Sequence, residues 1–595
     1  MAIADVRRVS LHVPATEYMD DRRMTDPQMS RKSEPVPLGT FRPFYRHTPL
    51  PSNWLRDMPV IEGESELPDY LFANSFPYRR RDPREGLFVN GYNAVRLLGG
   101  WDKRYAGNVI DDSTEPGQFD LAYRAGDGRI QYRWGLLKER LDPLQKNGFL
   151  ENSTLVLDNV PWCFPENPGP GPFGQVQPPA DRREWREFVS ALCRQLVELY
   201  GAGSANKLRF RLGTECQGSA GKTGHNRFDG SEARFLEHYR DSALAVKEVL
   251  PDARFGPFNL AGLDQGLDKH LINYRHIAEY CVEQDLPFDF VAHSLYYVPL
   301  FGYRSPLAGI DPVRDHDKVS NCDPDEKTRY YTDFWNDLRS LHPRFRDVPY
   351  EMHEYGTLTN ELGLPGHDSE ARFAAQHFHT IVNLLEGGLT GMDHWGLLKG
   401  FPYHREFQCL NGLGWLFMVF DHLAGGDAYG VPLPDSSTVN TRYRCLAVAL
   451  PDEVVLVLSA FNIYRHIHVP ESVTVQLPDC LGPVAPETAQ IASLSDANSP
   501  TKAFRDDLAR ANLLPDDYAL HPDVMPFAPR KELVTDPAAA TDLAKRNADR
   551  YEQMLRSSLT LAPFDGVLRE DGGATELELR LRPPEVAVMV VRRSR

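Results

Sequence analysis

The chain has few cysteines for its length, and they form no metal or redox motif. Its 595 residues include 8 cysteines, with no Cys-x-x-Cys pair and no Cys/His cluster at zinc-ligand spacing. We therefore expect scattered, reduced thiols and no bound metal. A chain of this length can bury a large core without disulfides or a metal to hold it together.

Long hydrophobic runs are also lacking. Apolar runs such as Val454–Leu458 have the length of a strand, whereas a membrane-spanning helix needs about 20 apolar residues. The N-terminal residues Met1–Val13 contain no apolar core of the kind found in signal peptides. The sequence therefore predicts a soluble, cytoplasmic protein with no membrane partner.

Basic residues are not in excess either. The 66 Lys and Arg are outnumbered by 83 Asp and Glu, giving a net charge of −17, which argues against a nucleic-acid partner because phosphate binding needs clustered cations. Aromatic residues, in contrast, are plentiful, with 8 Trp, 25 Tyr and 30 Phe. Aromatic rings can stack on sugars, so this composition suits a carbohydrate partner, although most aromatic residues pack in the core.

Between about residues 85 and 424, short apolar runs alternate with amphipathic helical segments, a pattern typical of a parallel sheet. Their number over this length predicts an α/β fold, a (β/α)8 TIM barrel with extended loops. A doubly wound sheet is the alternative, but no Gly-x-Gly-x-x-Gly turn follows the first strand. The expected strands are 94–98, 153–157, 208–212, 254–256, 288–292, 348–352 and 389–392, and the expected helices are 185–200, 231–250 and 370–387.

The flanking segments show a different pattern. Over residues 425–595 the apolar residues alternate, which predicts an accessory antiparallel β-sandwich domain. A helical insert is expected at about 482–562, where Asp536 can cap a helix that reaches Leu555. Residues 1–84 are predicted to form an N-terminal extension, and its alternating segment Val6–Val13 is expected to add a strand to the β-domain. The expected strands of this domain are 444–449, 454–460, 472–477, 576–581 and 586–591.

Two of the expected barrel strands run directly into glutamates. Residues 208–212 lead to Glu215, and residues 348–352 lead to Glu354. Catalytic residues of (β/α)8 barrels lie at the C-terminal ends of strands. Glycosidic cleavage needs two carboxyl groups, one to protonate the leaving oxygen and one to attack or to activate water. Glu351 competes with Glu354, but three residues of regular strand would place it on the opposite face.

Several segments also follow one another in the order found in glycoside hydrolase family 39, a family of retaining (β/α)8 glycosidases. The resemblance extends over about residues 85–425, and it implies the barrel, an accessory β-domain and glycosidase activity without a cofactor. The segments that resemble the family are Trp134–Gly148, Trp185–Gly201, Phe235–Gly256, His293–Tyr297, His394–Trp395 and Asn411–Gly414.

The resemblance assigns roles to individual residues. It implies that Glu215 is the general acid/base and that Glu354 is the nucleophile that forms a covalent glycosyl-enzyme intermediate. Thr214 stands where the family carries an asparagine that contacts the sugar, and its shorter side chain cannot reach as an amide does. The remaining substrate-binding candidates are Arg96, Trp162, Gln217, Asn259, His293, Tyr296, Tyr297 and Trp395.

Two other functions stay open at this stage. Thr214 leaves room for a catalytically inactive carbohydrate-binding protein on the same barrel. Histidines 293, 353 and 394 could instead join Glu354 in a metal-dependent hydrolase or isomerase, although their spacing is a weak signal. The identity of the sugar, its anomeric configuration and a homo-oligomeric state are left undecided. Lys399 and Arg405 follow the last expected barrel strand and could bind an acidic sugar.

Overall fold

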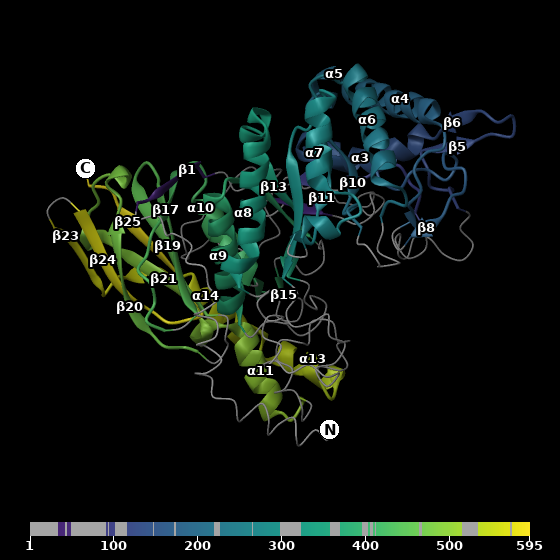
Figure 1. Ribbon diagram of the computed structural model, residues 1–595. Coiled ribbons are helices and arrows are strands. Elements are labelled where there is room, and N and C mark those ends of the chain that lie inside the picture. Colours follow the sequence, from purple (N-terminus) through teal and green to yellow (C-terminus); the bar gives the residue numbers. More distant parts are fainter. Residues whose placement is uncertain are drawn as a thin grey trace.

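The computed structural model places a helix-covered parallel sheet beside antiparallel sheets (Figure 1). Helix α9 (Glu370–Glu386) lies between the two parts and contacts both β14 of the parallel sheet and β18, β19 and β25 of the antiparallel one. The structure describes residues 34–41, 45–48, 91–92, 95–101, 116–146, 148–171, 174–218, 227–263, 266–297, 323–357, 369–395, 403–404, 409–410, 412–438, 440–462, 467–514, 534–571 and 574–594.

The parallel sheet has nine strands. Its order is β3-β2-β14-β13-β12-β11-β10-β7-β4, and all neighbouring strands are parallel. The two outermost strands are β3 (Gly91–Tyr92) and β4 (Val95–Arg96), which are separated by only two residues in the chain. The arrangement fits a (β/α)8 barrel. The other strands are β2 (Tyr45–Thr48), β7 (Thr154–Val156), β10 (Arg209–Thr214), β11 (Arg254–Leu260), β12 (Val291–Tyr297), β13 (Tyr350–Thr357) and β14 (Leu389–Trp395).

The seven strands expected from the sequence in this region all overlap observed strands, but the sheet starts earlier than residue 85. Its first strand is β2, which pairs with β14 and β3. The sequence of β2, Tyr-Arg-His-Thr, contains no apolar run, so periodicity could not reveal it. The preceding strand β1 (Val36–Thr40) pairs with β17 (Asp427–Val431) of the antiparallel sheet, while Val6–Val13 lies outside the described residues.

Three helices around the parallel sheet had been predicted from the sequence, and the structure contains all three, although α4 begins at Arg182 and not at Trp185. Ser231 caps α6 by accepting from the Arg234 amide, and the amides of Gly201 and Gly387 close α4 and α9. None of the helices in the described part of the chain is both long and apolar enough to cross a membrane. The helices of this part are α3 (Trp134–Lys146), α4 (Arg182–Tyr200), α5 (Ala202–Ala205), α6 (Glu232–Val249), α7 (Tyr274–Glu283) and α8 (Pro324–Leu341).

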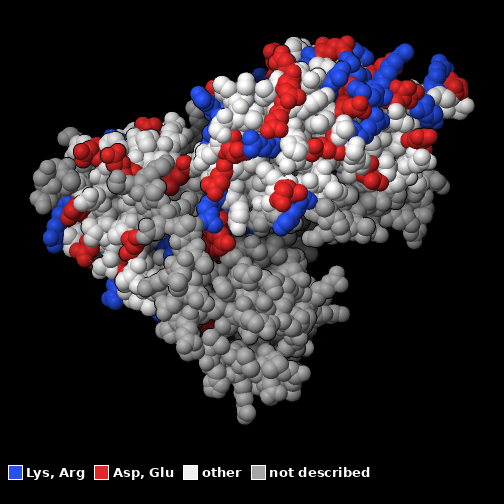
Figure 2. All heavy atoms as spheres, in the orientation of Figure 1, with Lys and Arg blue, Asp and Glu red and all other residues white. Residues whose placement is uncertain are grey.

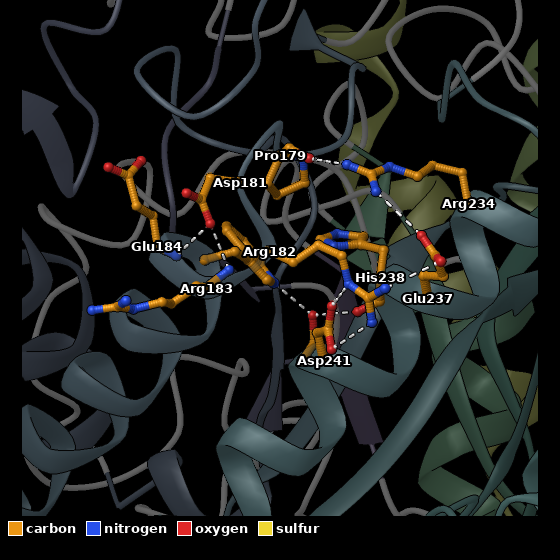
Figure 3. Close-up of polar contacts among 11 residues, drawn as sticks. Pro179, Asp181, Arg182, Arg183, Glu184, Arg234, Glu237, His238 and Asp241 are labelled. Carbon is orange, nitrogen blue, oxygen red and sulfur yellow. Dashed lines mark hydrogen bonds and ion pairs between the residues drawn. The ribbon is translucent and has the colours of Figure 1, made fainter.

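Helices α4 and α6 are joined by ion pairs and a buried histidine (Figure 3). Arg182 binds the buried Asp241, with Nη2 3.0 Å from Oδ1, and also lies 3.1 Å from Glu237. The His238 ring packs 5.0 Å from Trp185, and burial lowers the pKa of His238 to about 3. Figure 2 shows basic and acidic side chains intermingled over α4, which is typical of a solvated helix face rather than of a phosphate-binding surface.

The antiparallel strands form a seven-stranded sheet, β1-β17-β18-β19-β25-β21-β22, and a three-stranded sheet, β20-β24-β23. One face of the larger sheet shares an apolar cluster with the smaller sheet. The other face packs with α9 and with α10 (Gly412–His422) in a second cluster. The strands are β18 (Thr441–Ala449), β19 (Glu453–Asn462), β20 (Glu471–Leu477), β21 (Gln490–Ser495), β22 (Ala562–Pro563), β23 (Val567–Asp571), β24 (Ala574–Leu581) and β25 (Glu585–Arg592).

All five strands expected in this region are present, and the expected insert is only partly helical. Strand β21 lies within residues 482–562 and pairs with β25. Asp536 caps a helix with Pro537 at its first turn, as expected, but the helix is divided at Asn547. The helices are α11 (Pro500–Arg510), α13 (Pro537–Arg546) and α14 (Ala548–Ser558), and the small hairpins are β5 (Ala122–Arg124) with β6 (Ile130–Tyr132), β8 (Pro170–Gly171) with β9 (Gly174–Gln175), and β15 (Tyr403–His404) with β16 (Cys409–Leu410).

Glu471 fixes the loop before β18 to the start of β20. Its carboxylate accepts hydrogen bonds from the hydroxyls of Ser436, Ser437 and Tyr443 at 2.7–2.8 Å and from the amide of Thr438 at 2.9 Å. Burial by itself would raise the pKa of Glu471, but these hydrogen bonds outweigh it and lower the pKa to about 2.

We expect the contribution of Glu471 to stability to disappear in acid. Because the pKa of Glu471 is lower in the folded than in the unfolded chain, its stabilisation is complete above the ordinary value of 4.5 and is lost as the pH falls toward about 2. Glu471→Gln should therefore cost about 1–2 kcal/mol at pH 7, and the deficit should shrink between pH 4.5 and 3. Urea unfolding of both proteins at pH 7, 4.5 and 3 measures it. A deficit that stayed constant to pH 3 would contradict this account.

Candidate active site

Polar residues gather at the C-terminal ends of neighbouring barrel strands. Glu215 directly follows β10, and Glu354 lies in the second half of β13. Tyr296 is near the end of β12, Arg96 ends β4, and Asp158 follows β7 by two residues. Because the strands are parallel, all of these residues reach the same rim of the barrel.

Glu354 is the more buried of the two glutamates. It is 4% exposed, and the Tyr296 hydroxyl donates to its Oε2 at 2.9 Å. Burial and then the charge of Glu215 raise the pKa of Glu354, while Arg227, Arg211 and Arg96 act in the opposite direction. The charge of Glu215 therefore acts on Glu354 across the rim.

The same arrangement affects Tyr296. Burial, followed by the charges of Glu354 and Glu215, raises the pKa of Tyr296 well above its ordinary value. The phenol therefore stays protonated and remains a hydrogen-bond donor to Glu354. Tyr296 thus contacts Glu354 directly, and the charge of Glu215 also acts on it.

Glu215 is held in an unusual backbone conformation. Its φ is 47°, in the left-handed region that residues with a side chain rarely occupy, and its amide donates to the carbonyl of Asn259 at 3.2 Å. Glu215 Oε2 lies 3.3 Å from Nη2 of Arg227, and the Glu215 side chain is 20% exposed. Strain of this kind is concentrated at binding and catalytic sites, because the surrounding structure must maintain it.

A bulge in β13 corrects the expectation for Glu351. His293 and Ser294 are consecutive in β12, but they pair with Met352 and Glu354, so His353 is an extra residue in β13. The pairing with β14 shows the same extra residue. Glu351 and Glu354 therefore point to the same side of the sheet, the barrel interior, and not to opposite faces as a regular strand would require.

What distinguishes Glu351 from Glu354 is its ion pair with Arg209. Arg209 Nη1 donates to Glu351 Oε1 at 3.0 Å, and a second contact joins Nη2 to Oε2. His353 Nε2 lies 2.7 Å from Glu351, and its Nδ1 lies 3.0 Å from Arg211. Arg211 in turn donates to Thr214 Oγ1 at 3.0 Å. These buried groups form a layer beneath the rim that carries Glu354.

Two of the three histidines of the metal-site alternative are engaged within the protein, and the side chain of the third, His394, lies outside the described residues. Both ring nitrogens of His353 contact other side chains, and His293 accepts from the Trp335 indole at 2.8 Å. No group of three or more His, Cys, Asp or Glu within the described ranges is placed to hold a metal ion.

His293 does not line the site, contrary to the sequence-based expectation. Its ring packs among Tyr274, Tyr331 and Trp335, with centroids 5.3–6.0 Å apart, and is fully buried. Successive residues of a strand alternate between faces. Since Tyr296 faces Glu354, His293 faces the surrounding helices.

Other expected substrate-binding residues do lie at the rim, and some have buried polar atoms with no hydrogen-bond partner. These atoms are Trp162 Nε1, Gln217 Oε1 and Asn259 Oδ1. Buried polar atoms are normally paired, so such exceptions indicate groups that a ligand can satisfy. Asn259 Nδ2 already donates to Ser294 at 2.6 Å, which leaves its carbonyl oxygen open for a sugar hydroxyl.

Arg96 and Thr214 are engaged within the protein. Arg96 forms an ion pair with Asp158 at 3.3 Å, and burial lowers the pKa of Arg96 to about 10 although Asp158 raises it. The hydroxyl of Thr214 accepts from Arg211, so it supports the network below the rim. The side chains of Tyr297 and Trp395, as well as Lys399 and Arg405, lie outside the described residues.

Arg211 and Arg227 were not among the site residues predicted from the sequence. Arg211 had a usable signal, because Arg209 and Arg211 alternate with apolar residues in an expected barrel strand and so share its inner face. Arg227 had none. It lies 12 residues after Glu215 in a connecting segment, and only the folded chain brings it to the carboxylate.

Residues 120–385, which include both glutamates, match the model of the glycosyl hydrolases family 39. An alpha-1,4-L-rhamnosidase of Formosa agariphila is 26% identical over 289 residues, or 46% of this chain and 52% of that protein. A beta-xylosidase of Caldicellulosiruptor saccharolyticus is 22% identical over 315 residues, or 49% and 56% of the two chains. The chain thus spans about half the length of these curated relatives.

Solved structures extend the similarity in fold over nearly the whole chain. The GH39 enzyme from Xanthomonas axonopodis pv. citri has a TM-score of 0.54 at 14% identity, covering 96% of this chain and 100% of its own. A beta-xylosidase from Caulobacter crescentus CB15 has a TM-score of 0.52 at 14% identity, covering 94% and 98%. The chain is therefore similar in sequence to the family 39 glycosyl hydrolases over residues 120–385, and it shares their fold.

Proposed function

We propose that this relative of the family 39 glycosyl hydrolases is a retaining O-glycoside hydrolase that acts on oligo- or polysaccharides. The observation that carries the proposal is the carboxyl pair, Glu215 and Glu354, at the C-terminal rim of a parallel barrel. A retaining mechanism needs two carboxyl groups about 5–5.5 Å apart, one as nucleophile and one as acid/base.

The surroundings of the pair support one assignment of roles. Glu354 is held by Tyr296 and faced by three guanidinium groups, which favour a carboxylate that can attack the anomeric carbon. Glu215 is more exposed, so it can reach the glycosidic oxygen. In the first step the anomeric carbon–oxygen bond breaks, Glu354 bonds to the carbon, and the proton of Glu215 moves to the leaving oxygen.

In the second step the roles of Glu215 reverse. Its carboxylate takes a proton from water, the water oxygen bonds to the anomeric carbon, and the bond to Glu354 breaks. The open amide oxygen of Asn259 and the indole of Trp162 are available to the sugar. The proposed chemistry uses these side chains and needs no cofactor.

We further propose that the parallel barrel carries the reaction and that the two antiparallel sheets form an accessory β-sandwich. The apolar cluster shared by the two sheets supports a sandwich. The names of the relatives suggest deoxyhexosides and pentosides as first substrates, because they are a rhamnosidase and xylosidases. Side chains from the accessory sheets are not needed in the proposed mechanism.

The stereochemistry of the first product tests the proposal. We would screen 4-nitrophenyl glycosides, including the α-L-rhamnoside and the β-D-xyloside, together with rhamnose- and xylose-containing oligosaccharides. Proton NMR would then follow the anomeric signal of the first product formed. We expect the configuration of the substrate to be retained.

Inversion would overturn the double-displacement mechanism. A protein that hydrolyses none of these compounds, yet binds an oligosaccharide in calorimetry, would favour the catalytically inactive carbohydrate-binding alternative. Loss of activity after dialysis against EDTA, with recovery on addition of a divalent cation, would point to a metal-dependent hydrolase.

A further inference from the structure

Arg227 contacts one carboxyl group of the pair, and its charge acts on the other. Its Nη2 is 3.3 Å from Glu215 Oε2, and its side chain is 13% exposed. Its charge also acts on Glu354, Tyr296 and Arg96. Arg227 is thus a rim cation in contact with the glutamate that we assign as the acid.

This contact conflicts with the proposed first step. Glu215 must contact the glycosidic oxygen in that step, and Arg227 Nη2 already lies 3.3 Å from its Oε2. The guanidinium and the substrate therefore compete for the same carboxyl group. Something must replace this contact when a substrate binds.

The other two arginines near the pair are placed differently. Arg96 has Asp158 as its ion-pair partner, at 3.3 Å. Arg211 donates to Thr214 and contacts His353 in the layer below the rim, and the charge of Asp393 acts on Arg211 as well. Among the described contacts, the ion pair of Arg227 is the one that involves the proposed acid, Glu215.

We propose that Arg227 binds an anionic group, a carboxylate or a sulfate, carried by the sugar on the leaving-group side, and that this contact replaces the ion pair with Glu215. The inference rests on the proposed function. Glu215 must touch the glycosidic oxygen, so a guanidinium that contacts Glu215 faces the leaving sugar. The planar fork of arginine matches the oxygens of a carboxylate or a sulfate, and it can exchange one anion for the other without losing charge compensation.

This arrangement gives specificity as well as binding. An anionic leaving sugar draws Arg227 away from Glu215, whose carboxyl group can then contact the glycosidic oxygen. A neutral leaving sugar leaves the ion pair in place and reacts slowly. The enzyme would thus favour acidic glycans, because they displace Arg227 from Glu215.

Matched pairs of disaccharides test the proposal. The glycone is the sugar identified in the glycoside screen, and the leaving sugar is glucuronic acid or glucose in one pair and glucose 6-sulfate or glucose in the other. We expect the wild type to prefer the anionic member by about 10- to 100-fold in kcat/KM. Arg227→Gln should reduce that preference to about twofold, and Arg227→Lys should retain part of it. Comparing the two pairs separates carboxylate from sulfate.

The dependence on the substrate supplies a readout that a merely structural role would not move. Arg227→Gln should lower kcat/KM for the anionic member of a pair much more than for its neutral partner, whereas a structural defect would lower both alike. Arg254→Gln, at the exposed start of β11 on the opposite rim, is the matched control and should leave the preference unchanged.

Binding distinguishes failure of this inference from failure of the proposed function. Calorimetry of the same disaccharides with intact chain needs no turnover. If no glycoside is hydrolysed but the anionic sugars bind more tightly and only when Arg227 is present, the hydrolase proposal falls and the anion site stands. Equal kcat/KM and equal affinity for anionic and neutral members in the wild type, or a preference that survives in Arg227→Gln, would overturn the inference.

Discussion

Glu354→Gln is expected to lower kcat by about 10⁴-fold or more, because it removes the group that bonds to the anomeric carbon. Glutamine has nearly the same shape, and its amide oxygen can still accept from Tyr296, which now donates to Glu354 at 2.9 Å. The loss therefore reports chemistry rather than misfolding. The measurement is kcat on the best substrate of the glycoside screen, with circular dichroism to verify the fold.

A matched control separates this effect from a general loss of acidic charge. Glu187→Gln removes a carboxylate from the exposed face of α4, where Glu187 pairs only with Arg183 at 3.0 Å among the described contacts. We expect its kcat to stay within about twofold of the wild type, since exposed ion pairs contribute little. A kcat of Glu354→Gln within tenfold of the wild type would contradict the assignment of Glu354 as nucleophile.

Azide then distinguishes the nucleophile from the acid/base. In Glu354→Gly, azide can occupy the space of the missing carboxylate and attack the anomeric carbon directly, which should restore turnover and release a glycosyl azide of inverted configuration. In Glu215→Gly, azide would instead attack the covalent intermediate and give a product of retained configuration. NMR of the two azides identifies the role of each glutamate.

Strands with an apolar pattern could be predicted from the sequence. Residues 208–212 and 348–352 are hydrophobic enough to mark β10 and β13, and the ends of these strands located both glutamates. Helix ends were predictable for a similar reason, since Ser231 and Gly387 act through local backbone geometry. The features that depend only on neighbouring residues were the ones that the sequence revealed.

Features that depend on distant segments could not be predicted. The polar strand β2 is specified by its pairing with β14, and the bulge at His353 is visible only in the register with β12 and β14. That one extra residue decides the face on which Glu351 lies. The contact between Arg227 and Glu215 likewise arises from a connecting segment whose path local periodicity does not specify.

Glu351→Gln is expected to lower stability rather than to abolish the chemistry. The substitution would leave the guanidinium of Arg209, which is 5% exposed and lies 4.6 Å above the ring of Phe290, without its anionic partner. Removing one member of a buried ion pair costs about 3–5 kcal/mol, because the remaining charge is neither hydrated nor compensated. Urea unfolding followed by tryptophan fluorescence measures this loss, and Glu187→Gln should cost less than about 0.5 kcal/mol.

The double variant Arg209→Met/Glu351→Leu shows whether the loss comes from an uncompensated charge. If the unpaired guanidinium is responsible, removing both charges should recover much of the stability that Glu351→Gln loses, since an apolar pair can replace a buried ion pair. The same comparison separates the two glutamates of β13: at temperatures where Glu351→Gln is folded, its kcat should exceed that of Glu354→Gln by about 10³-fold or more. A double variant less stable than Glu351→Gln, or equal losses of kcat at both positions, would mean that the layer beneath the rim takes part in the reaction instead of supporting it. Because the bulge at His353 places Glu351 and Glu354 on one side of the sheet, only this measurement, and not the face of the strand, assigns them different roles.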